Sequence, residues 1–178
     1  MDHTLLLHLH TAVGTVGLLL GPVAMWQDTR SMRAGRGPAG GLSAAYPWSV
    51  LAVGLTAIAL VAWYRDDLWW LVPVAVISAA LPVLGRHAAA RRPRGWSHWY
   101  VHGLGGSYIA LVSALLVVDL TVNGPLRGAA ALVPWLAPTA VGLVLIEWWR
   151  RRLVAVPGPG GRGRPADAEP AIGAASHD

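Results

Sequence analysis

Residues 5–36 read LLLHLHTAVGTVGLLLGPVAMWQDTRSMRAGR, an apolar run that closes on a tryptophan and is followed by three arginines. The apolar part, Leu5 to Trp26, is long enough to cross a bilayer core as one helix, which takes about 20 residues. Arginines are retained on the cytoplasmic side of membrane spans, so Arg30, Arg33 and Arg36 predict a helix that ends inside and begins outside. We expect this helix to be retained, because no positive charge precedes it as in a signal peptide.

The same alternation of apolar and arginine-rich segments continues along the chain. Further apolar runs lie at 46–64, 68–84, 99–118 and 129–149. All arginines except Arg65 and Arg127 lie in every second connection, namely 27–45, 85–97 and the segment from residue 150. Only 13% of the 178 residues are charged, against about 25% in soluble domains. The sequence predicts an all-α integral membrane bundle of five transmembrane helices in the bacterial cytoplasmic membrane, with the N-terminus outside and the C-terminus cytoplasmic.

The five predicted spans leave no room for a second folded domain. We therefore expect one transmembrane domain over residues 1–156. Residues 157–178 begin with Pro-Gly-Pro-Gly-Gly and continue with small and acidic residues, a composition that cannot bury enough apolar surface to fold. The sequence predicts a disordered cytoplasmic tail there. Pro47 is expected in the first turn of the second helix, where its missing N–H costs no hydrogen bond.

Composition also excludes several classes of function. The chain has no cysteine, which excludes disulfides, iron–sulfur clusters, thiolate zinc sites and covalently attached c-type haem. Its net charge of +5 is explained by arginines at span ends, so the expected partner is the lipid bilayer and not nucleic acid. No segment carries a known catalytic signature. The sequence therefore predicts a multi-pass membrane protein without a catalytic assignment.

One face of the first predicted span is polar. Four residues fall at i, i+4, i+7 and i+11 on this face: Thr4, His8, Thr11 and Thr15. His10 and three glycines repeat that spacing on another face, which favours close helix packing. Asp119 ends the fourth predicted span on the outer side of the membrane, where His8 and His10 are also expected. This arrangement leaves open a small transporter or channel that uses the polar face with Asp119.

Histidines in two spans leave open a haem-binding or metal-binding redox protein. His98 and His102 lie one turn apart, and Tyr108 is a further polar candidate in the same span. We expect His98 at the interface and His102 directed into the bundle, with a partner there. The cofactor-binding candidates are His102, His8 and His10. His8 and His102 lie in opposite leaflets, roughly 15 to 20 Å apart, and cannot share one haem in a protomer. Three arrangements of a haem stay open: ligation by a single histidine, a second ligand from the loop residue His87, or a haem shared between copies in a homo-oligomer.

The residues around these histidines resemble a known group of proteins. The similarity covers roughly Leu5 to Val118 and rests on Leu7-His8-Leu9-His10, Gly14, Gly17, Leu20-Gly21-Pro22, His98-Trp99-Tyr100-Val101-His102-Gly103 and Gly106-Ser107-Tyr108-Ile109-Ala110. These segments are similar to a family of predicted bacterial membrane proteins, a domain of unknown function with a histidine in the first span. Members carry a His-Arg-x-x-Gly-Arg segment after that span, and Met32-Arg33-Ala34-Gly35-Arg36 lacks its histidine and one spacer residue. The resemblance implies a multi-span inner-membrane protein and no established reaction.

Overall fold

The computed structural model describes residues 2–154, and all regular structure in that range is helical. In chain order the elements are α1 (His3–Arg33), α2 (Leu42–Tyr64), η1 (Asp66–Leu68), α3 (Leu71–Arg91), α4 (Trp96–Val117), η2 (Val118–Val122), η3 (Gly128–Leu132) and α5 (Val133–Val154). The described part contains five helices long and apolar enough to cross a membrane. This confirms the all-α class and the five candidate spans. The tail predicted at 157–178 lies outside the described residues.

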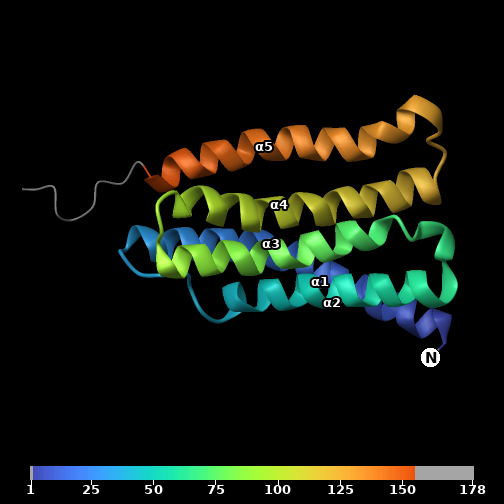
Figure 1. Cartoon of the computed structure of the whole chain (residues 1–178), viewed down its shortest axis with the longest axis horizontal. Helices are drawn as coiled ribbons and strands as arrows, with labels where there is room; N and C mark the ends of the chain where they lie inside the picture. Colours follow the sequence, from blue (N-terminus) through green and yellow to red (C-terminus); the bar gives the residue numbers. More distant parts are fainter. Residues whose placement is uncertain (1, 155–178) are drawn as a thin grey trace, which may run out of the picture.

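The arginine-rich connections gather at one end of the bundle. Figure 1 shows the long helices side by side, with the α1–α2 and α3–α4 connections and the end of α5 at one end. The N-terminus, η1 and the α4–α5 connection lie at the other. We call these the arginine-rich end and the N-terminal end. The bundle thus has the charge asymmetry on which the orientation rests, while the orientation itself stays a prediction.

Within the described residues, α1 and α3 extend furthest past their apolar runs. α1 continues past Trp26 to Arg33, and α3 continues past residue 84 to Arg91. Hydrophobicity marks only the segment that fits a bilayer core, whereas a helix continues as long as its residues favour it. The segment 87–91, His-Ala-Ala-Ala-Arg, contains three alanines, the strongest helix former. Both helices therefore project beyond the predicted spans at the arginine-rich end.

The expected position of Pro47 is wrong. α2 begins at Leu42, so Pro47 lies inside the helix and not in its first turn. Proline has no N–H to donate to the carbonyl four residues earlier, which here belongs to Ser43. Arg86 Nη1 lies 3.4 Å from that carbonyl oxygen and donates a long hydrogen bond to it. A side chain from α3 thus partly replaces the bond that the proline removes.

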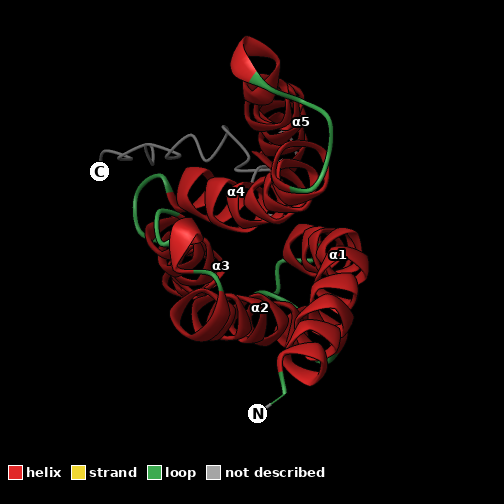
Figure 2. Ribbon diagram, turned by 90° about the vertical axis from the view of Figure 1, so that its right-hand side faces the viewer, coloured by secondary structure: helices red, strands yellow, loops and turns green. Residues whose placement is uncertain are grey.

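The helices surround a core that lies toward the arginine-rich end. Figure 2 shows α1, α2, α3 and α4 around a common axis, with α5 on the outside of α4. Tyr46, Tyr100, Val101 and Leu104 in this core are completely buried. Large apolar side chains such as Leu19 and Val144 are about 70% exposed on the outer surface. So much exposed apolar surface is unsuited to water and fits contact with lipid.

α3 and α4 cross in close contact at two glycines. A Cβ atom added to Gly103 would lie 2.6 Å from the carbonyl oxygen of Leu81 and 2.8 Å from the Cα of Gly85. A Cβ atom on Gly85 would lie 3.1 Å from the carbonyl oxygen of Tyr100. Because these neighbours are backbone atoms, no side chain can turn away to make room. Small residues let the two backbones approach, as is common between membrane helices.

The α2–α3 turn carries an exposed ion pair. Arg65 donates from Nε and Nη2 to the carboxylate of Asp67, at 2.9 Å in each case. This hydrogen bonding, together with the positive charge, holds the pKa of Asp67 below its usual value. Both side chains remain largely exposed, so the pair is weakened by solvent.

Candidate functional site

A cavity of about 420 Å³ lies among α1, α2, α3 and α4 in the half of the bundle nearer the N-terminal end. We call it the four-helix cavity. Most of its wall is apolar, with Leu7, Val53, Val74 and Leu115 among the lining residues. Its polar lining residues are His10, Thr11, Thr15, Ser78, Asp119 and Asn123. A mainly apolar cavity with a few polar groups is the usual form of a small-molecule site.

His10 is fixed in the wall by a hydrogen bond to α2. Its Nδ1 lies 2.9 Å from Thr56 Oγ1. The Thr56 hydroxyl donates its only proton to the carbonyl oxygen of Ala52 at 2.8 Å or of Val53 at 3.0 Å, and therefore accepts from His10. The neutral tautomer that fits this hydroxyl donation carries its proton on Nδ1 and has Nε2 as a hydrogen-bond acceptor.

The hydroxyl groups of the cavity are also left as acceptors. Thr11 and Thr15 donate to the carbonyl oxygens of Leu7 and Thr11, at 2.9 and 2.8 Å. Ser78 donates to the carbonyl oxygen of Val74 at 2.6 Å. Each hydroxyl has one proton, so only its lone pairs remain for a ligand. With the carboxylate of Asp119, every polar side chain on the wall except Asn123 offers acceptors alone.

The cavity ends near the middle of the bundle. Val50 on its wall is only 1% exposed, and one helical turn further the hydroxyls of Tyr46 and Ser107 are hydrogen-bonded at 2.8 Å. Tyr46 and Ser107 are completely buried. The packed core continues from there toward the arginine-rich end. The four-helix cavity is therefore closed on that side, while Asp119 and Asn123 extend its wall toward the N-terminal end.

The cavity brings together part of the polar set that the sequence singles out. Thr11, Thr15 and Asp119 line it, and so does His10 from the neighbouring face of α1. Thr4 and His8 are exposed on α1 and do not line the cavity. Tyr108 lies elsewhere, with its ring against Gly21 of α1. The face of α1 that lines the cavity thus lies between the polar face predicted from the sequence and the face that carries His10 and the glycines. Gly14 forms part of the cavity wall.

His98 and His102 form a pair on α4. Their ring centroids are 3.9 Å apart, and His102 Nδ1 lies 3.0 Å from the carbonyl oxygen of His98. Within residues 2–154 these are the hydrogen bond and the ring contact of His102, so the expected polar partner on another helix is not observed. In the same range no three histidine, aspartate or glutamate side chains gather as a metal site of three protein ligands requires. Haem binding by His102, His8 or His10 stays a prediction.

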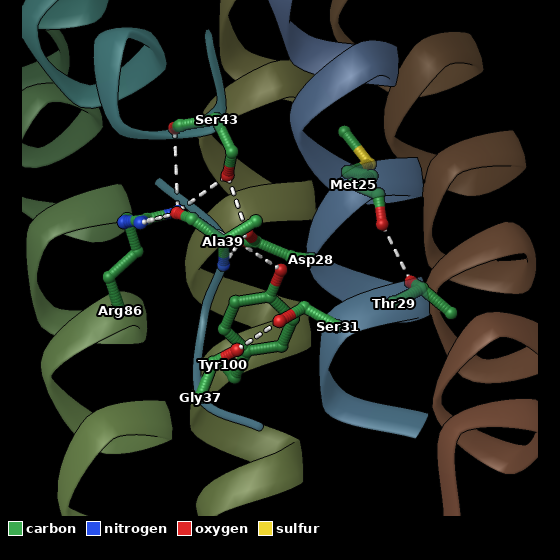
Figure 3. A network of polar contacts seen from close by, with 9 residues as sticks. All are labelled: Met25, Asp28, Thr29, Ser31, Gly37, Ala39, Ser43, Arg86 and Tyr100. Atoms are coloured by element: carbon green, nitrogen blue, oxygen red, sulfur yellow. Dashed lines mark hydrogen bonds and ion pairs between the residues drawn. The ribbon is translucent and has the colours of Figure 1, made fainter. Parts of the chain in front are cut away.

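A second polar site, which sequence reasoning misses, is centred on Asp28 near the arginine-rich end (Figure 3). Asp28 is completely buried. Its Oδ2 accepts from Arg86 Nη1 at 2.7 Å and from the Tyr100 hydroxyl at 2.8 Å. Its Oδ1 accepts from the Ser43 hydroxyl and from the Ala39 N–H, the latter at 2.7 Å. These residues come from α1, α2, α3, α4 and the α1–α2 connection. We call them the Asp28 network.

Arg86 completes this network from α3. Besides Asp28, its Nη1 donates to Ser43 Oγ at 2.7 Å, and its Nη2 donates to the carbonyl oxygen of Ala39 at 2.7 Å. A buried carboxylate is stable only when it is paired and fully hydrogen-bonded, and here both oxygens have two donors. One signal could have revealed the site: Asp28 is the only acidic residue in the segments 27–45 and 85–97.

Comparisons with known proteins add no relative. No protein-family model matches this chain, and no match was found among curated proteins or solved structures. The resemblance to a family of predicted bacterial membrane proteins therefore stays a prediction.

Proposed function

We propose that this chain is a multi-pass protein of the cytoplasmic membrane that takes up a small amphipathic cation from outside into the four-helix cavity. The observation that carries this proposal is the chemistry of the cavity wall: apolar side chains, hydrogen-bond acceptors and one carboxylate. A ligand with an apolar body and a protonated amine supplies the donors that these acceptors lack. Asp119 would pair with its charge.

The closed half of the bundle favours a carrier over an open channel. A channel needs a continuous path, whereas Tyr46, Val101 and Leu104 fill the bundle beyond the cavity. A cavity accessible from one side at a time is the arrangement that carriers use, and ligand sites in transporters lie near the bilayer midplane. The prolines inside α1, α3 and α5, namely Pro22, Pro82 and Pro138, are positions at which those helices could bend during such a cycle.

Labelling of single cysteines tests the outside access of the cavity. The chain has no cysteine of its own, so each introduced thiol reports on one position. We expect Thr15→Cys to react in intact cells with a membrane-impermeant, cationic methanethiosulfonate. Adding Asp119→Asn should slow the cationic reagent but not a neutral methanethiosulfonate, because Asp119 lines the same cavity and its carboxylate attracts a cation.

Ala24→Cys is the matched control, because Ala24 lies on the same helix and is completely buried. It should react only after denaturation. If Thr15→Cys also reacts only after denaturation, the cavity is not open to the outside. If Asp119→Asn leaves the ratio of the two rates unchanged, the cation preference is wrong.

A further inference from the structure

A second apolar depression lies between α1 and α5, with α4 as its floor. It has a volume of about 480 Å³, and we call it the α1–α5 groove. Figure 2 shows why it forms: α5 packs on α4 outside the ring of the other helices. Along the groove the lining is apolar and includes Pro22, Met25, Ile109 and Leu145. It suits a flexible hydrocarbon chain in its shape and chemistry.

Where the groove reaches the arginine-rich end of the bundle, its lining side chains are cationic and aromatic. Arg33 of α1 and Arg152 of α5 both line it, and Arg33 Nη2 donates to the carbonyl oxygen of Arg152 at 3.0 Å. The Arg152 guanidinium lies 3.9 Å from the ring centroid of Trp148. On the α1 side, Arg30 lies 4.8 Å from the ring centroid of Trp26. Tryptophan and arginine together are typical of helix ends at the membrane interface.

These arginines are not neutralised by the described part of the protein. Glu147 pairs with Arg150 and Arg151, and Asp28 pairs with Arg86. Within residues 2–154, no carboxylate lies within ion-pair distance of Arg30, Arg33 or Arg152. Two guanidinium groups therefore stand at the mouth of an apolar groove, and residues 2–154 supply no anion to pair with them.

We propose that the α1–α5 groove binds one anionic phospholipid. Its phosphate would lie between Arg33 and Arg152, and one acyl chain would follow the apolar lining. Basic pockets between membrane helices on the cytoplasmic side select anionic head groups for this reason. The inference rests on the membrane location in the proposed function, and it is independent of any ligand in the four-helix cavity.

Lipid retention by the purified full-length protein tests this inference. The protein in neutral detergent is mixed with phosphatidylglycerol or with phosphatidylcholine of the same acyl chains, and bound lipids are counted by native mass spectrometry. We expect one phosphatidylglycerol to be retained in preference to phosphatidylcholine. Arg33→Gln and Arg152→Gln should each weaken its binding about fivefold, because one arginine near an anionic head group is worth about 1 kcal/mol.

Three controls separate this site from general attraction. Arg91→Gln removes an exposed charge at the same end of the bundle, away from the groove, and should leave binding unchanged. Leu145→Trp, at a 57% exposed groove position, should weaken lipid binding without changing the charge. Inorganic phosphate has the head-group charge but no acyl chain and should not raise the melting temperature. Any one of four results would overturn the proposal. These are equal retention of both lipids, a loss of binding in Arg91→Gln equal to that in the groove variants, full binding in Leu145→Trp, and stabilisation by phosphate alone.

Discussion

Replacing Asp28 with alanine should destabilise the folded protein by about 3–5 kcal/mol, because it leaves the Arg86 guanidinium largely buried without a counter-charge. The side chain of Arg86 is only 18% exposed, so water can compensate little of the loss. Three further donors, from Ser43, Tyr100 and Ala39, lose their acceptor in the same variant. The measurement is equilibrium unfolding or the melting temperature in detergent micelles.

A double-mutant cycle separates the ion pair from general damage. Asp28→Ala with Arg86→Ala should cost less than the sum of the single variants, because neither charge is then left alone. The matched control is Asp67→Ala, which breaks the exposed pair with Arg65 and should leave the melting temperature almost unchanged. If Asp28→Ala is as mild as Asp67→Ala, the Asp28 network does not hold the helices together.

Gly103→Ala should be the second severe substitution, with a loss of at least about 2 kcal/mol. The added methyl group would lie within 3 Å of backbone atoms of Leu81 and Gly85, so α3 and α4 would have to move apart. In an exposed helix the same change would stabilise by about 1 kcal/mol, which makes the sign of the effect informative. Melting temperature and the yield of folded protein check it.

Gly106→Ala is the matched control on the same helix. A Cβ atom there would lie 3.6 Å from the Cδ1 of Leu81, an ordinary van der Waals distance. This variant should be neutral or slightly stabilised. A tolerated Gly103→Ala, or an equal loss in both variants, would contradict the close α3–α4 contact.

The helices could be predicted from the sequence because each depends on a local signal. Apolar runs with tryptophans and arginines at their ends mark five segments, and each run falls within or overlaps an observed helix. The helix ends are less predictable, as α1 and α3 show, because the bilayer limits the apolar run and not the helix. Pro47 departs from its expected place because α2 begins at Leu42, before the apolar run. The carbonyl that the proline leaves free lies 3.4 Å from Arg86 of another helix, a contact that the sequence does not indicate.

The sites depend on contacts between distant residues and were predictable only in part. The Asp28 network joins residues 58 and 72 positions apart, so its partners cannot be read from neighbouring positions. The isolation of Asp28 among arginines marks it as unusual but does not identify Arg86 or Tyr100 as its partners. The sequence does indicate Thr11, Thr15 and Asp119 as polar residues that avoid lipid. It cannot show that His10 lines the same cavity while His8 is exposed, because the rotation of α1 is set by its packing on α2.

The orientation of the bundle is the claim on which the outside access of the cavity and the lipid site both depend, and reporter fusions measure it most directly. Reporters placed after Arg36, Arg92 and Arg152 should give a cytoplasmic signal, and reporters after Asp67 and Asn123 should give an external one. The first group lies in the α1–α2 and α3–α4 connections and at the end of α5, which Figure 1 shows at the arginine-rich end. The second lies in η1 and the α4–α5 connection, at the N-terminal end. An external signal at Arg92, or a cytoplasmic one at Asp67, would contradict the account.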